Sequence, residues 1–518
     1  MLRGFGHTIE GEFYFPSSRR VFRLPPLEAT FPKPFYKPLP FSLQAEPRSS
    51  RGGVLPFSLV VVPIFISRTF PYPDAGSVPN PYPQPQPWLV LQKLRAFAFD
   101  SDYLRNVSQL VGGTAAAQVI SVLVSPVLSR LYTPADFGAF AVYLSSISVL
   151  LVTVSFRYEL GIVIAKSRTE ALHLLGLSFL FLGGVCLLSL ALLFFGQQAV
   201  VAYVGGEAYR PIVFLIPLAG FLSGGYQILG HWANRNKRFA VLAGSRVVQS
   251  GTNAGTATLL GGLGFLELGL LLGHGLGALL GFGLLLRQSS ASLRQNQPLL
   301  RWRRLRHTLV KYREFPLFSL PNALLDAVSL VLPVFLITTF FSAGLTGQYS
   351  LAYRVMNLPL GVVGLAVGQV FFQKLSETFH RQGDCRGLIR KTWRSLFWLG
   401  VGPTLGMLFF GPALFRFVFG PEWEEAGRLA SLLALPLFFS FCSAPTSSAL
   451  VVYRLQKLSF FFGIAAITMR PLAFYVGYLH GDLHLSLILW AAVEILLILA
   501  YNAVVYRRSP GVNKPMNE

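Results

Sequence analysis

The chain has 518 residues, of which 53% are hydrophobic and only 13% are charged, whereas a soluble domain usually carries about 25% charged residues. Most of this chain therefore cannot face water. Its three cysteines are widely scattered, with no CxxC pair and no Cys/His cluster, so neither a disulfide framework nor a metal site is expected. The net charge of +22 would suit a nucleic-acid-binding protein, but the chain has no base-stacking motif, and no nucleic-acid partner is predicted.

The first 92 residues differ from the rest in composition. They hold 17 of the 34 prolines, and proline lacks an N–H and clashes with the preceding turn, so a regular helix is excluded. The best apolar run, 54–66, is too short to cross a bilayer, which needs about 20 residues, and no convincing signal-peptide cleavage site follows it. We interpret 1–92 as a disordered extension or as the product of a mistaken upstream start codon.

From residue 107 onward, apolar runs long enough to cross about 30 Å alternate with short polar loops. They predict an all-α integral membrane protein of about twelve spans. The spans lie near 107–129, 137–156, 171–195, 210–230, 241–261, 264–286, 315–341, 349–372, 394–412, 429–452, 458–479 and 484–506. A glycine at every fourth position of the sixth span lets a neighbouring backbone approach closely: Gly269, Gly273, Gly277 and Gly281.

The lysines and arginines alternate between the two sides of this arrangement. If the segment before the first span is cytoplasmic, the inside loops after residue 92 carry 29 Lys and Arg. The outside loops carry four, which are Arg130, Arg210, Arg416 and Arg428. Because positive residues are retained on the cytoplasmic side, both termini are predicted to be cytoplasmic. The basic loop 287–313 then faces anionic lipid headgroups.

The longest inside loop, 287–314, separates a six-span half at 93–286 from a second half at 315–518. The segment VSPVLSRLYTPADFGAFAVYLSS (124–146) resembles VLPVFLITTFFSAGLTGQYSLAYRV (331–355). In both, a proline in one helix is followed by a short turn, a glycine and an aromatic-rich helix. Six spans in each half make the repeat parallel, and binding sites in such transporters lie between the halves near mid-membrane.

Five segments carry a family resemblance: LSRLYTPADFGAFAVYLS (128–145), RYELGIVIAK (157–166), REFPLFSLPNALLDAVSLVLPV (313–334), GQYSLAYRVMNLPLGVVGLAVGQVFFQKLSE (347–377) and FGPEWEEAGRLASLLALPL (419–437). With them, residues 104–506 resemble the polysaccharide-biosynthesis, or oligosaccharide flippase, family. Its superfamily also contains multidrug and toxin extruders and lipid II flippases. The resemblance implies an extruder-like fold of two halves around a central cavity.

The same resemblance implies a function, a location and partners. It implies a non-enzyme of the bacterial inner (plasma) membrane, without catalytic residues, cofactor or metal. The substrate implied is an undecaprenyl-diphosphate-linked oligosaccharide, which is flipped for the synthesis of lipopolysaccharide, capsule or exopolysaccharide. The implied partners are this polyprenyl-diphosphate-linked glycan, membrane lipids, and the polysaccharide polymerase and chain-length proteins.

Arginines inside or beside the spans are the candidates for binding the diphosphate. An ionisable residue inside a span is costly and is a functional candidate by default, and Arg binds phosphate through charge-assisted hydrogen bonds. Arg354 falls in the eighth span and Arg470 near the middle of the eleventh. Arg130 and Arg157 flank the first hairpin, where anchoring at the membrane interface is the alternative interpretation.

Four ionisable residues fall at similar depths in their predicted spans. His274, Arg470, Glu494 and Asp326 lie 11 or 12 residues from the inner end, which places them about 16–18 Å deep. Arg470 and Glu494, on consecutive antiparallel spans, are predicted either to pair with each other or, for Arg470, to bind substrate. Asp326 is the candidate for a coupling proton or cation, and His274 and Glu494 are grouped with it as candidates for ion coupling or for an intramembrane pair. Ion coupling stays open because the first span has no acid, whereas the resemblance to drug extruders implies one there.

Two other functions remain open. A multidrug or cation antiporter belongs to the same superfamily, and a membrane glycosyltransferase or polymerase would need clustered carboxylates near a membrane face. The predicted outside loops are short, the longest being 411–428, and their acids are scattered except for Glu422, Glu424 and Glu425. That trio also suits a solvated helix start, where acids complement the helix dipole.

Overall fold

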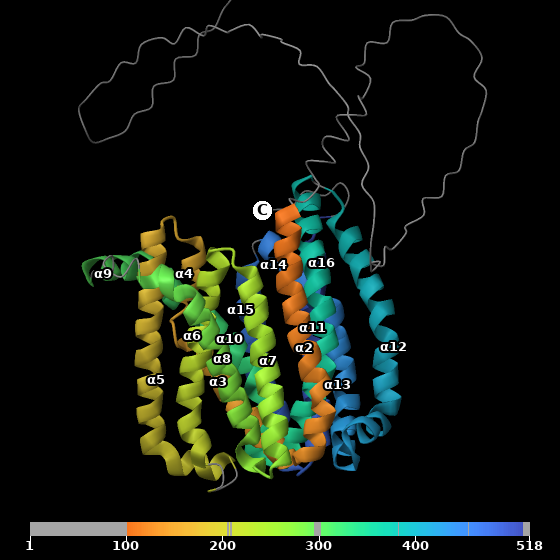
Figure 1. Ribbon diagram of the computed structural model, residues 1–518. Coiled ribbons are helices and arrows are strands. Elements are labelled where there is room, and N and C mark those ends of the chain that lie inside the picture. The colour runs from red at the N-terminus through yellow and green to blue at the C-terminus, as the bar shows by residue number, and fades with distance from the viewer. Residues whose placement is uncertain are drawn as a thin grey trace, which may run out of the picture. The chain divides into compact units, whose positions relative to one another are not determined.

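The structure, a computed structural model, describes residues 101–204, 207, 210–294, 302–381, 383–453 and 455–510 (Figure 1). Within these ranges every regular element is helical. The prediction for the extension 1–92 falls outside the described residues. Ten helical stretches in this part of the chain are long and apolar enough to cross a membrane.

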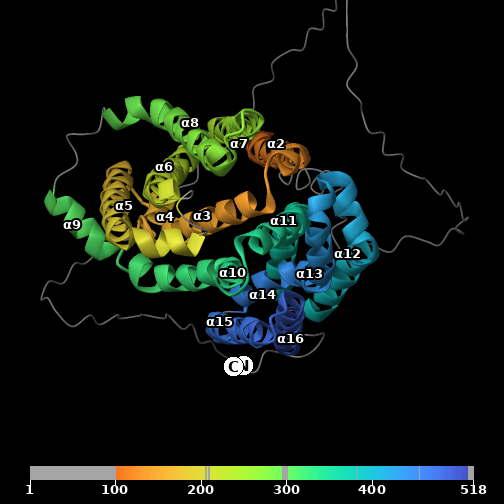
Figure 2. The same ribbon diagram turned by 90° about the horizontal axis from the view of Figure 1, so that it is seen from below.

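Each predicted span corresponds to one long helical segment. The first six are α2 (Ser101–Leu131), α3 (Pro134–Thr153), α5 (Arg168–Val204), α6 (Arg210–Arg235), α7 (Phe239–Gly262) and α8 (Leu266–Arg294). The last six are α10 (Leu320–Phe340, preceded by the short π-helix η3, Phe315–Ser319), α11 (Ala343–His380), α12 (Cys385–Phe419), α13 (Glu424–Ser443, continued by η5, Ala444–Thr446, and α14, Ser447–Val452), α15 (Gln456–Leu479) and α16 (Leu483–Arg508). The predicted all-α membrane fold is confirmed, and Figure 2 shows the first six and the last six as two groups.

Two short helices were not predicted. Helix α4 (Tyr158–Ile164) follows α3 after a turn at 154–157, and helix α9 (Trp302–Lys311) lies within the linker that the sequence predicted as a loop. In α9, Leu309 packs on the apolar cluster around α4 and α5, and Lys311 pairs with Glu170 of α5. The segment WRRLRHTLVK is amphipathic and rich in arginine. It contains no continuous apolar run, so a search for membrane spans does not detect this helix.

The two ends of the bundle differ in charge. Helices α4 and α9 and the turn at 236–238 lie at the upper end in Figure 1, which we call the basic end. The opposite end, which we call the far end, holds the turns before α3, α8, α11 and α16. Most Lys and Arg residues of the loops gather at the basic end.

The helices α3 and α11 start alike at the far end. Thr133 is the N-cap of α3 and accepts a hydrogen bond from the backbone N–H of Asp136. Ser342 is the N-cap of α11 and accepts one from the backbone N–H of Leu345. Such caps satisfy backbone donors that the first helical turn leaves free. The repeat in the sequence thus appears as two equivalent helix starts.

These two helix starts cross with their backbones in contact. A Cβ atom added to Gly138 of α3 would lie 1.8 Å from the carbonyl oxygen of Ala343. A Cβ added to Gly347 of α11 would lie 1.8 Å from the carbonyl oxygen of Pro134. The contact is reciprocal, because each glycine rests on the first residue of the other helix. It closes the far end between the two halves.

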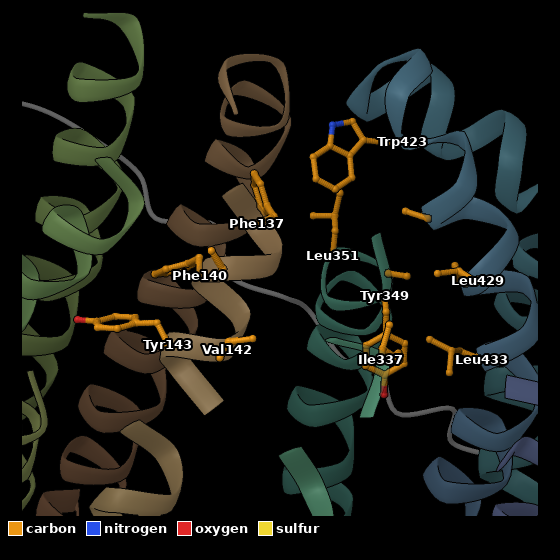
Figure 3. Close-up of a cluster of buried hydrophobic side chains, with 14 of the residues drawn as sticks. Phe137, Phe140, Val142, Tyr143, Ile337, Tyr349, Leu351, Trp423, Leu429 and Leu433 are labelled. Carbon is orange, nitrogen blue, oxygen red and sulfur yellow. The ribbon is translucent and has the colours of Figure 1, made fainter. Parts of the chain in front are cut away.

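Aromatic side chains extend this contact. Phe137 of α3 and Trp423 (in η4, Pro421–Trp423) meet edge to face with ring centroids 4.9 Å apart (Figure 3). The indole N–H of Trp423 donates to the carbonyl oxygen of Ser129 at 2.8 Å. The Ser129 hydroxyl donates to the carbonyl oxygen of Phe419 at 3.0 Å. Both hydrogen bonds join the first half to the second.

The glycine stripe of α8 packs against α7. A Cβ added to Gly273 would lie 2.9 Å from the carbonyl oxygen of Asn253, and one added to Gly277 would lie 2.6 Å from that of Gln249. Only glycine permits so close a contact between helices. The structural interpretation of this stripe is confirmed.

Candidate functional site

Three adjoining cavities lie inside the bundle. The first, of about 490 Å³, is lined by α2, α3, α10 and α11, and it shares Gln118 and Arg354 with the second, of about 290 Å³. The second shares Arg246, Gln249 and His274 with the third, of about 470 Å³, which is lined by α3, α6, α7 and α8. We call the three together the central cavity. Its walls come from both halves.

Apart from tyrosines, the ionisable side chains that line the central cavity are basic. They are Arg246, Arg354, His231 and His274. None of the described residues that line the three cavities is an aspartate or a glutamate. An anion would therefore meet the two arginine cations without competing carboxylates.

Arg354 comes from the second half. It lies in α11, follows the stacked rings of Tyr349 and Tyr353, whose centroids are 5.9 Å apart, and borders the first and second cavities. Within the described part of the chain its guanidinium makes no hydrogen bond or ion pair that would neutralise it. The predicted candidate is thus placed at the cavity, with its donors available.

Arg246 comes from the first half, and the sequence analysis missed it. The charge pattern places Arg246 with the basic residues of the cytoplasmic side, at the start of the span 241–261. In the structure it lies in the third turn of α7, borders two cavities and donates to the Thr114 hydroxyl of α2. Gln249, Ser250 and Asn253 line the cavity beside it. Spacings of three and four residues place all of them on one helix face, and this polar stripe in a predicted span was the signal available.

His274 of α8 lies next to an aromatic wall. Its Nδ1 is 3.3 Å from the Tyr143 hydroxyl, and the two rings meet edge to face with centroids 5.5 Å apart. It lines the cavity with Arg246 and Arg354. His274 was predicted to lie near the middle of its span, and in the structure it lies at the central cavity. Its role in ion coupling stays a prediction.

Arg470 and Glu494 form an ion pair. The Nε and Nη2 of Arg470 donate to the two carboxylate oxygens of Glu494 at 3.0 and 2.9 Å, and Nη1 donates to the Ser329 hydroxyl of α10. The two charged side chains are 16% and 18% exposed. Neither borders the central cavity. Of the two alternatives for Arg470, the structure therefore favours pairing.

Removing Arg470 alone should destabilise the protein more than removing the pair. Arg470→Ala leaves a largely buried carboxylate, and breaking such a pair costs about 3 kcal/mol. Thermal unfolding in detergent should therefore show a clear drop for the single variant and recovery when Arg470→Met is combined with Glu494→Leu. Equal instability of the double variant would show that the arginine has another role.

Three other candidates lie away from the cavity. Arg130 is exposed in the last turn of α2. Arg157 precedes α4 with a φ of +65° and lies 3.7 Å from the buried carboxylate of Glu159. Asp326 is exposed on α10. None of the three borders the central cavity, so their roles in binding or coupling stay predictions.

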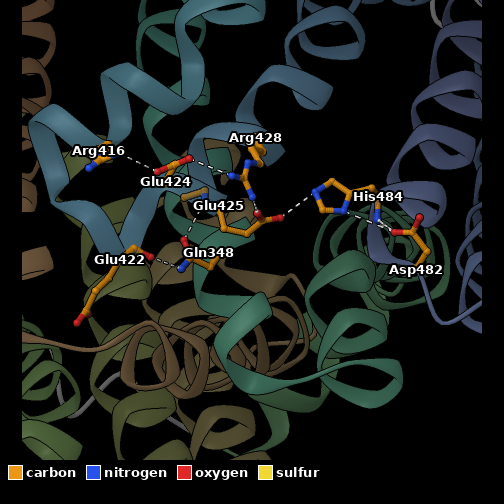
Figure 4. Close-up of polar contacts among 9 residues, drawn as sticks. Gln348, Arg416, Glu422, Glu424, Glu425, Arg428, Asp482 and His484 are labelled. Carbon is orange, nitrogen blue, oxygen red and sulfur yellow. Dashed lines mark hydrogen bonds and ion pairs between the residues drawn. The ribbon is translucent and has the colours of Figure 1, made fainter.

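The acids of the far end form a surface network (Figure 4). Glu424 and Glu425 lie in the first turn of α13, and both pair with Arg428, at 2.9 and 3.1 Å. Glu425 also lies 2.8 Å from Nε2 of His484, at the start of α16. Two of the three acids predicted as a solvated helix start, Glu424 and Glu425, thus tie helix ends together.

Residues 127–428 match the family model described as polysaccharide biosynthesis protein. The teichuronic acid biosynthesis protein TuaB of Bacillus subtilis (strain 168) is 21% identical over 169 residues, which are 33% of this chain and 35% of that protein. The matched region is thus about a third of that relative's length.

Solved structures share the fold at low sequence identity. The lipid II flippase MurJ in an inward closed conformation has a TM-score of 0.62 and 13% identity, over 76% of this chain and 86% of that one. A multidrug resistance MATE family transporter of the MOP superfamily, in an inward-facing conformation, has a TM-score of 0.55 and 13% identity, over 76% and 94%. The predicted two-half fold is confirmed.

Proposed function

The chain belongs to the polysaccharide biosynthesis protein family, and we propose that it flips undecaprenyl-diphosphate-linked oligosaccharide across the bacterial inner membrane for surface polysaccharide synthesis. The observation that carries the proposal is the central cavity, in which Arg246 and Arg354 meet without a lining carboxylate. A diphosphate is the part of this substrate that needs such cations. Each guanidinium presents a planar pair of donors that fits phosphate oxygens.

The two arginines would hold the substrate between the halves. Arg246 belongs to the first half and Arg354 to the second, so a diphosphate bound to both is released when the halves move apart. Amide and hydroxyl side chains of the cavity suit a sugar head, since they both donate and accept hydrogen bonds. Ser223 and Ser350 are examples, because their buried hydroxyls have no hydrogen-bond partner within the described residues.

The orientation follows from the charge difference between the ends. We place the basic end in the cytoplasm, since cytoplasmic loops retain Lys and Arg. Cysteine labelling checks this in a chain whose three native cysteines are replaced by serine. Glu422→Cys should react with a membrane-impermeant maleimide in intact cells, whereas Arg304→Cys should react only after permeabilisation. The reverse pattern would overturn the orientation.

Reconstituted vesicles test the transport itself. A fluorescent undecaprenyl-diphosphate oligosaccharide should become accessible on both sides of the vesicle in the presence of the protein, and its mass should be unchanged. Ethidium, a cationic drug, should not be transported, because the cavity lining is itself basic. Ethidium transport without lipid flipping would support the antiporter alternative. A changed mass of the lipid would support the glycosyltransferase or polymerase alternative.

A further inference from the structure

A second pocket, of about 360 Å³, lies within the last six helices. It is formed by one face of α12 and by parts of α13 and α16, and it shares no lining residue with the central cavity. Figure 2 shows α12 and α16 at the periphery of the bundle. We call this pocket the α12–α16 groove. Its lining residues are Arg390, Trp393, Arg394, Phe397, Phe438, Phe439, Cys442, Ser443, Leu499 and Asn502.

The polarity of the groove changes along its length. At the basic end lie Arg390 and Arg394 in the first three turns of α12, with Ser443 at the end of α13. Deeper in the bundle lie apolar residues, including Phe397, which is 43% exposed, and Leu499, which is 50% exposed. A lipid has the same order of parts, with a polar headgroup above an apolar chain.

Hydrogen bonds and ring contacts hold together the part of the groove that lies at the basic end. The indole N–H of Trp393 donates to the Thr446 hydroxyl at 2.9 Å, and its ring lies 5.7 Å from that of Tyr506 of α16. Ser443 of α13 and Asn502 of α16 are hydrogen-bonded at 2.9 Å. The three helices are thus joined beside the two arginines.

Neither arginine forms an ion pair with a residue that the structure describes, although Asp384, the N-cap of α12, acts on Arg390 through its charge. Arg390 donates to the Tyr506 hydroxyl at 2.5 Å. Arg394 makes no hydrogen bond or ion pair with any residue that the structure describes. No aspartate or glutamate is among the described residues that line the groove. The site therefore calls for an anion next to an apolar chain.

We propose that the α12–α16 groove binds an anionic phospholipid of the leaflet at the basic end. Its phosphate would lie between Arg390 and Arg394, which can donate to phosphate oxygens, and an acyl chain would lie along Phe397, Phe438 and Leu499. Basic pockets between membrane helices on the cytoplasmic side recognise acidic headgroups in this way. This binding does not depend on the proposed flipping of a glycan lipid.

Cys442 offers a reporter inside the groove, because Cys186 and Cys385 are buried while Cys442 is only partly buried. Purified protein in detergent would be treated with N-ethylmaleimide and weighed by intact mass spectrometry. Phosphatidylglycerol should slow the modification of Cys442 at concentrations at which phosphatidylcholine with the same acyl chains does not. The variant Cys442→Ser identifies the modified thiol.

Arginine variants test the role of the charges. In Arg394→Gln and in Arg390→Gln, the concentration of phosphatidylglycerol that protects Cys442 should rise by about fivefold. Each basic residue contributes about 1 kcal/mol to the attraction of an anionic lipid, and losing that energy weakens binding by this factor. Lys391→Gln is the matched control, since Lys391 is exposed on the same helix and does not line the groove. If Arg390→Gln loses the Tyr506 contact and fails to fold, Arg394→Gln still tests the proposal, because Arg394 makes no such contact.

Three outcomes would overturn the proposal. They are equal protection by phosphatidylcholine, unchanged protection in Arg394→Gln, and protection by undecaprenyl phosphate but not by phosphatidylglycerol. The last would assign the groove to a polyprenyl lipid. Because the measurement involves no transport, its failure is distinguishable from failure of the flipping assay.

Discussion

Replacing Arg354 by alanine should abolish surface-polysaccharide export while the protein stays in the membrane. The guanidinium of Arg354 borders two of the three cavities and has no protein partner among the described residues, so its removal deletes substrate contacts without stranding a carboxylate. Loss of a hydrogen bond to a charged group costs about 2 kcal/mol, or about thirtyfold in binding. Arg354→Lys should restore export only in part, because an ammonium lacks the planar pair of donors.

The same measurement applies to the other half. Arg246→Ala should also reduce export strongly, and the double variant should be inactive. Arg303→Ala is the matched control, since Arg303 is exposed on α9 and lies outside the central cavity. Membrane levels would be followed by immunoblot. Normal export from Arg354→Ala would exclude this arginine as a substrate ligand.

Adding a side chain at the reciprocal glycine contact should stop export by preventing closure of the far end. In Gly138→Leu the new Cβ would lie 1.8 Å from the Ala343 carbonyl oxygen, so the helices must separate. Overpacking costs about 1–3 kcal/mol, which lowers the closed population by about five- to 150-fold. Ser129, which is 4% exposed, provides the readout, because Ser129→Cys should become reactive towards maleimide in the Gly138→Leu background.

Gly347→Leu should have the same effect from the other half. Gly184→Leu is the control, since a Cβ there meets nothing within 4 Å. Transport at the normal level by both far-end variants, with an unreactive Ser129→Cys, would show that the crossing tolerates separation. Loss of the protein from the membrane would be visible on the same immunoblot.

The sequence predicted the helices well and their ends poorly. The length of an apolar run is set by the bilayer, so each span could be found, but a helix continues into water without any apolar pattern. Helix α12 begins at Cys385, nine residues before the predicted start, because Arg386, Arg390 and Lys391 were interpreted as a loop. This is why the cationic end of the α12–α16 groove was not foreseen.

The central cavity was predictable only in part. Arg354 stood out because it interrupts an apolar run, whereas Arg246 lies near the start of a span, where arginines are expected from the positive-inside rule. The pairing of Arg470 with Glu494 could be anticipated because their spans are consecutive. The face of α7 that packs against α2 could not be anticipated, because it depends on packing between helices that are distant in the sequence.

The polarity of α7 bears on how the chain is inserted during its synthesis. Helix α7 is not among the helices that are apolar enough to cross a membrane by composition, and a polar helix partitions poorly into lipid on its own. Its partner follows after the short turn at 263–265, where Gly264 has a φ of +84°. Close backbone packing of Gly273 and Gly277 covers one side of α7. We expect α7 and α8 to leave the translocon together as a helical hairpin, so that a ribosome-bound chain ending within α8 would still hold α7 outside the lipid.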